Sequence, residues 1–153
     1  MEILKAATDW AKAEVFSSQF FILFGILFIM ASIGFWQLGK TVLAQAFIFP
    51  TLIAGGLLLA IGLGLFFTNK SRVNSFPDAY QDDAAAFVQT ETLRAEKTEK
   101  EYQTVFKVIP LIIVAAALLI FFIDKPLWRA ICITTIAMKA VILFEDTTAN
   151  ARM

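Results

Sequence analysis

Long apolar runs alternate with polar stretches along this chain. A helix of about 20 residues crosses the roughly 30 Å hydrocarbon core of a bilayer, and four runs have about that length: residues 16–38, 41–67, 105–123 and 126–144. The fourth is the most polar run because it contains Arg129, Lys139 and two threonines. The pattern predicts an all-α integral membrane protein with four transmembrane helices arranged as two hairpins.

The polar stretches divide the chain into further units. The predicted units are an N-terminal segment 1–15, a first transmembrane hairpin 16–68, a charged helical stalk 69–107, a second transmembrane hairpin 108–144 and a tail 145–153. In the first unit, apolar residues gather on one helical face, as in a helix that lies in the membrane interface. That face contains Ile3, Leu4, Ala7, Trp10 and Ala11.

The charged segment 69–107 has the signals of a long helix. Pro77 and Asp78 are residue types that favour a first helical turn, and oppositely charged side chains follow at spacings of three or four residues. No glycine separates this segment from the third apolar run. We therefore expect one helix that begins near Pro77 and continues into the third span, with a bend at Pro110.

A narrow apolar stripe runs along the predicted stalk and needs something to pack against. The stripe contains Tyr80, Phe87, Val88 and Tyr102. One interpretation is a docking face for a partner or for the same stalk in a neighbouring subunit. The alternative is a linker helix that folds back over the lipid headgroups.

The second apolar run carries small residues at every fourth position, namely Gly56, Ala60 and Gly64. Small residues let helix backbones approach closely in lipid, where water does not drive association. The spacing predicts a packing face for another subunit or for another span of the same chain.

Ionisable side chains within spans are candidates for a polar site. Lys139 lies inside the fourth run, and Glu14, just before the first run, is one candidate carboxylate partner. Glu145 and Asp146 are the others. Arg129 lies near the other end of the fourth run. Anchoring or ion pairing of Lys139 and an anion or headgroup site are the alternatives.

Composition agrees with a membrane protein, since 59% of the 153 residues are hydrophobic and 17% are charged against about 25% in soluble domains. The formal net charge is zero, so we expect no nucleic-acid partner. The lone cysteine, Cys132, is expected to be a packing residue.

The distribution of basic residues predicts the orientation. Nine lysines and arginines fall on the side of the N-terminus and three on the other side, which favours cytoplasmic N- and C-termini. We expect the membrane to be a bacterial inner membrane. The first set is Lys5, Lys12, Lys70, Arg72, Arg94, Lys97, Lys100, Lys107 and Arg152, and the second is Lys40, Lys125 and Arg129.

The sequence lacks histidine and any glycine-rich phosphate loop, so the usual parts of metal, acid–base and nucleotide chemistry are missing. We expect no enzyme activity, no metal and no cofactor. The predicted function is that of a subunit of a membrane complex, in contact with lipid, that self-associates or docks another membrane protein. The alternative is a small homo-oligomeric channel or membrane-permeabilising effector, lined by the threonines, Arg129 and Lys139 of the last span.

Overall fold

The computed structural model describes residues 2–150 and the side chains of residues 2–149. All regular structure in this range is α-helical, which confirms the predicted class. The helices are α1 (Glu2–Leu38), α2 (Val42–Ala46), α3 (Ile48–Asp82), α4 (Ala84–Phe122) and α5 (Pro126–Asn150). The apolar parts of α1, α2 with α3, α4 and α5 are each long enough to cross a membrane, so the structure has four candidate spans.

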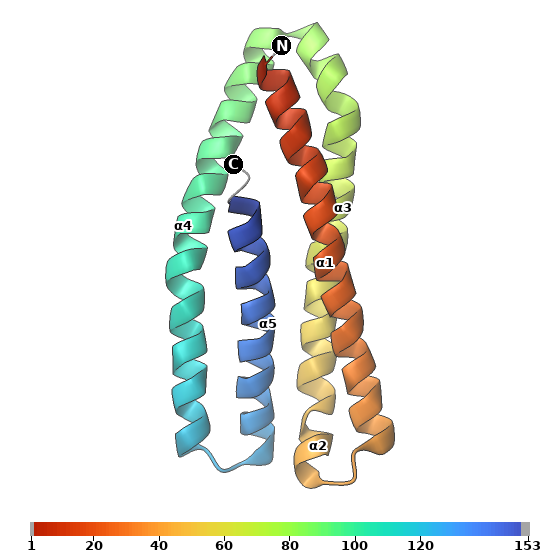
Figure 1. Cartoon of the computed structure of the whole chain (residues 1–153), viewed down its shortest axis with the longest axis vertical. Coiled ribbons are helices and arrows are strands. Elements are labelled where there is room, and N and C mark those ends of the chain that lie inside the picture. The colour runs from red at the N-terminus through yellow and green to blue at the C-terminus, as the bar shows by residue number, and fades with distance from the viewer. Residues whose placement is uncertain (1, 151–153) are drawn as a thin grey trace.

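The long helices run side by side, with α1 along α3 and α4 along α5 (Figure 1). The turns before α3 and before α5 lie at one end of the molecule (Figure 1). With 25 residues, α5 is shorter than the other long helices and ends well below the α3–α4 turn. The far end of the bundle therefore consists of residues 2–13, 70–82 and 84–100, from α1, α3 and α4, and we call this three-helix part the head.

The first helix is longer than a bilayer requires. Its 37 residues extend about 55 Å at about 1.5 Å per residue. No break separates residues 2–15 from the apolar run that follows. The segment expected to lie flat in the interface is instead the straight continuation of the first span, because its small apolar side chains pack inside the head.

The second apolar run is interrupted near its start, at Phe47 between α2 and α3. Pro50 explains the position, because a proline has no N–H for the carbonyl four residues earlier and its ring collides with that carbonyl. Pro50 itself lies in the first turn of α3, where helical N–H groups have no intrahelical acceptor. Thr41 caps α2, and its side chain accepts a hydrogen bond from the N–H of Ala44 at 3.1 Å.

The helix start expected at Pro77 is wrong. α3 continues through Pro77 to Asp82 and then breaks at Asp83, which has extended backbone angles. The Asp83 carboxylate accepts a hydrogen bond from the N–H of Ala86 at 2.9 Å and so caps α4. The stalk segment 69–107 thus consists of the end of α3, a break at Asp83 and the first part of α4. Phe76 is buried inside the head, and this packing holds the end of α3 helical despite the proline.

From Ala84 to Phe122, α4 is one unbroken helix that contains Pro110. The charged segment after Asp83 and the third apolar run therefore share one helix, as expected from the absence of glycine. At the other end of the chain, α5 extends to Asn150 and includes most of the predicted tail. Residues 151–153 of that tail lie outside the described residues.

Candidate functional site

Helices α1 and α3 pack closely against each other. An added Cβ on Gly25 would lie 2.9 Å from the backbone nitrogen of Leu59, and one on Gly62 would lie 2.9 Å from the backbone nitrogen of Ile22. Ser32 adds a hydrogen bond across the same contact, from its hydroxyl to the carbonyl of Ile48 at 2.7 Å. Backbone-to-backbone packing of this kind is what small residues permit in a membrane.

Gly56, Ala60 and Gly64, which were expected to form a packing face, are not part of this contact. All of them are exposed, and an added Cβ on Gly56 or Gly64 would meet no atom within 4 Å. Of the two interpretations of this face, packing against the same chain does not occur among the described residues. The face is open to whatever surrounds the helix.

The glycines that do make the contact were not among the predicted packing residues, although the sequence contains a signal for them. Small residues recur at intervals of seven in α1, at Ser18, Gly25 and Ser32, and in α3, at Gly55 and Gly62. A seven-residue repeat on two neighbouring helices is typical of a left-handed antiparallel pair. Matching seven-residue repeats on both helices identify this pair, whereas the four-residue repeat on α3 alone identifies the opposite face.

The apolar stripe of the charged segment is largely covered by the chain itself. Phe87 is 7% exposed and belongs to a cluster with Ala7, Ala11 and Phe76. Its ring centroid lies 5.3 Å from that of Phe76 and 5.7 Å from that of Tyr80, both in edge-to-face geometry. The stripe needed a partner, and α1 and α3 supply it at this level.

The remaining residues of the stripe are less enclosed. Val88 is partly buried in the head. Tyr102 lies farther along α4, where its ring stacks on that of Phe106 at 6.2 Å. The four residues expected to form one docking face therefore do not form one exposed surface.

Below the aromatic cluster, the head contains a charged pair that is mostly buried. Arg94 donates from Nε to Glu91 at 2.7 Å, and its terminal nitrogen lies 2.6 Å from the same oxygen. The guanidinium carbon lies 3.9 Å from the centroid of the Trp10 ring. An arginine can satisfy a carboxylate at its edge and an aromatic ring at its face simultaneously, so this group ties α4 to α1.

A polar cavity of about 350 Å³ lies where all four long helices meet, directly below that pair. Its wall includes Asn69, 1% exposed, and Glu14, 8% exposed. Asn69 donates to the carbonyl of Leu65 at 3.0 Å and accepts from Arg72 at 3.1 Å. Both acidic and basic side chains line the cavity. Polar groups are therefore gathered at the base of the head.

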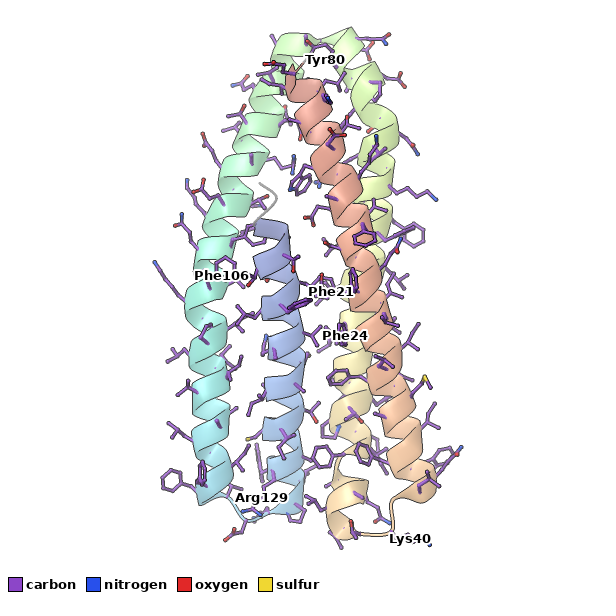
Figure 2. All side chains as sticks on the ribbon, in the orientation of Figure 1. Phe21, Phe24, Lys40, Tyr80, Phe106 and Arg129 are labelled. Atoms are coloured by element: carbon purple, nitrogen blue, oxygen red, sulfur yellow. The ribbon has the colours of Figure 1, made fainter. Side chains whose placement is uncertain are left out.

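The three residues proposed as an intramembrane polar site do not come together. Glu14 lines the polar cavity, whereas Arg129 lies at the opposite end of the bundle, near the turn before α5 (Figure 2). There Arg129 donates to the carbonyl of Ile123 at 3.0 Å and contacts Asp124 at 3.4 Å. The hydrogen bond to Ile123 caps the end of α4. Lys139 is half-buried on α5 and lines neither of these two places.

Within residues 2–150, no group of three or more metal-binding side chains is close enough to hold a metal ion. The chain matches no family model, no curated protein and no solved structure. The inference of function therefore depends on the geometry of the helices alone.

Proposed function

We propose that this chain is a non-enzymatic subunit of a membrane complex that associates through the outward face of α3. The observation that carries the proposal is the open space beside Gly56 and Gly64, on a helix whose opposite face already packs against α1. We call Gly56, Ala60 and Gly64 the association face.

A face of small residues favours helix association in a bilayer, because lipid tails pack poorly against a flat helix surface although they solvate large apolar side chains well. Association in a bilayer depends on close van der Waals contact between helices, which small residues allow. α3 carries both kinds of surface, since Leu57 and Leu63 are half-exposed beside the association face. A second helix, from another copy of this chain or from another membrane protein, would contact α3 there as closely as α1 contacts its other side.

The same proposal includes an arrangement in the membrane. The apolar parts of the four long helices span the bilayer as two hairpins, and the head projects into the cytoplasm with both termini on that side. The excess of lysine and arginine toward the head supports this direction. In this arrangement the head stands as a three-helix projection from a bacterial inner membrane and is available to soluble partners.

The test is the mass of the protein in lipid nanodiscs, with the lipid and scaffold contribution subtracted. We expect wild-type protein to form a dimer or larger assembly, and the double variant Gly56→Leu, Gly64→Leu to be monomeric. The matched control is Gly34→Leu on α1, where an added Cβ also meets no atom within 4 Å. The control should assemble as wild type does.

An unchanged assembly mass in the double variant would refute the association face. If wild-type protein is monomeric alone, the same variants are compared for the membrane proteins that copurify with them. Equal recovery of partners by wild-type protein and double variant would then refute the proposal.

A channel is the second function considered. It would require a polar stripe facing a shared axis, formed by the threonines, Arg129 and Lys139 of α5. Arg129 already caps α4 through the carbonyl of Ile123, and Thr134 is buried within the chain. These positions favour the subunit over the channel.

A further inference from the structure

The end of α5 forms one wall of the polar cavity at the base of the head. It contributes Glu145, Asp146 and Ala149 to the wall. Glu145 is 2% exposed and Ala149 is 5% exposed, so the end of α5 is packed against the other helices. All the charged residues of the wall lie outside the four apolar runs. The cavity therefore belongs to the boundary between the membrane part and the head, where water is close.

Most of the basic residues of the cavity wall are already paired within α4. Arg94 contacts Glu91 at 2.6 Å, and Lys97 contacts Glu101 at 3.8 Å. Each of these pairs joins one positive charge to one negative charge, so together they add no net charge to the cavity. The remaining basic residue of the wall is Arg72 on α3.

Three carboxyl groups line the same cavity as this guanidinium. Glu14 comes from α1, and Glu145 and Asp146 come from α5. Tyr102, the other titratable residue of the wall, adds no charge while its phenol is protonated. With all three acids ionised, Arg72 would stand alone against three carboxylates among the described residues. Like charges in a partly enclosed site favour the protonated form of a carboxyl group, so this arrangement favours the uptake of a proton.

Asp146 is the carboxyl group best placed to take up and release that proton. Burial raises the pKa of Asp146 from 3.8 to about 6. Its side chain is only partly buried, so water still reaches the carboxyl. When the end of α5 leaves the cavity, this carboxyl becomes solvated and its pKa returns toward the ordinary value. The proton is therefore held more tightly in the docked position than in the released one.

We propose that the end of α5, residues 143–150, is a proton-dependent switch that docks into the base of the head when Asp146 is protonated and is released when Asp146 loses its proton. After that loss, repulsion among the carboxylates of the cavity favours release. Docking is thus strongest at acid pH, weakens as the pH rises from about 4 to about 6, and is nearly constant above about 7. Release uncovers the base of the head, so the pH on this side of the membrane alters the surface offered to partners.

The test measures amide hydrogen exchange of residues 143–149 in the whole protein in nanodiscs at pH 5 and pH 8. Protection factors are compared, because they remove the intrinsic pH dependence of exchange. We expect the opening equilibrium constant of this segment to rise about tenfold from pH 5 to pH 8, the factor that follows from the two pKa values of the docked and released carboxyl. Residues 84–90, at the far end of the head, should keep the same protection at both pH values.

Asp146→Asn preserves the shape of the side chain and is neutral at every pH. It should protect the segment equally at pH 5 and pH 8, and at least as well as wild type does at pH 5. A residue with a purely structural role would not move the pH dependence in this way. The matched control is Asp78→Asn, which removes an exposed carboxyl of α3 in the head and should retain the wild-type pH dependence.

Three outcomes would overturn the proposal. The first two are wild-type protection that is independent of pH and wild-type protection that increases with pH. The third is the same pH dependence in wild type and Asp146→Asn. The first two need no variant, so the proposal is decided even if Asp146→Asn does not fold. None of them depends on the assembly mass, so the switch and the association face can fail separately.

Discussion

An added Cβ on Gly55 would lie 2.8 Å from the carbonyl oxygen of Gly25, across the contact between α1 and α3. The two glycines thus bring the backbones of the first and second candidate spans into direct contact. The neighbouring residue, Gly56, has open space beside it. Two adjacent positions on α3 therefore differ, since Gly55 lies in the contact with α1 and Gly56 faces away from it.

The glycine contact predicts opposite effects of the same substitution on two faces. Gly25→Ala and Gly55→Ala should each destabilise the protein by about 1–3 kcal/mol, the usual cost of overpacking. Gly34→Ala and Gly56→Ala should be neutral or stabilising, because alanine is the better helix former by roughly 0.5–1 kcal/mol. Unfolding by sodium dodecyl sulfate in mixed micelles measures the difference. Equal effects at Gly55 and Gly56 would contradict the packing described.

The aromatic cluster predicts that the head depends on Phe87. Phe87→Ala should destabilise the head by about 3–5 kcal/mol, because it removes a buried ring and leaves a cavity. Amide hydrogen exchange in residues 70–100 should rise, while the apolar parts of the helices stay protected. Leu93→Ala on the same helix is the control, since Leu93 is 59% exposed. Slow exchange in the head of Phe87→Ala would show that the cluster does not hold it together.

The contact of Arg94 with Trp10 predicts a measurable coupling. In a double-mutant cycle of Arg94→Lys and Trp10→Leu, we expect a coupling free energy of about 0.5–2 kcal/mol, the range of cation–π contacts. Lysine keeps the charge but loses the planar group that lies over the indole. Hydrogen exchange of the head is the readout for each variant.

The exposed pair of Lys97 with Glu101, with a nitrogen–oxygen distance of 3.8 Å, is the control for that cycle. Its coupling should be below about 1 kcal/mol, because solvent and salt screen exposed ion pairs. A coupling no larger for Arg94 and Trp10 than for the exposed pair would mean that the stacked geometry adds nothing to stability.

The turn between α3 and α4 predicts a local effect at Asp83. Asp83→Ala should cost about 0.5–2 kcal/mol, because the N–H of Ala86 loses its capping acceptor. Asp83→Asn keeps an acceptor and should retain most of the stability. Asp82→Ala is the control, because Asp82 is the last residue of α3 and exposed. If the two alanine variants are equally stable, Asp83 is not the cap that starts α4.

The sequence by itself determined the class of this protein and most of its helices. Apolar runs of about 20 residues leave few alternatives in lipid, where every backbone polar group must be bonded within its own helix. The continuity of the charged segment after Asp83 with the third candidate span also follows from local signals, since no glycine interrupts it. These properties depend on residues close together in the chain, so a single sequence contains them.

Only the tertiary structure decided which faces meet. Gly56 and Gly55 are equally small, and only the direction of α1 shows that Gly55 is covered and Gly56 is open. The N-terminal segment has the pattern of an interfacial helix, yet Phe76 and Phe87 give its apolar face a place inside the head. Pro77 resembles a helix start, and burial of Phe76 overrides it. Each of these outcomes depends on contacts between residues far apart in sequence, whose free energy exceeds the local preference of the chain.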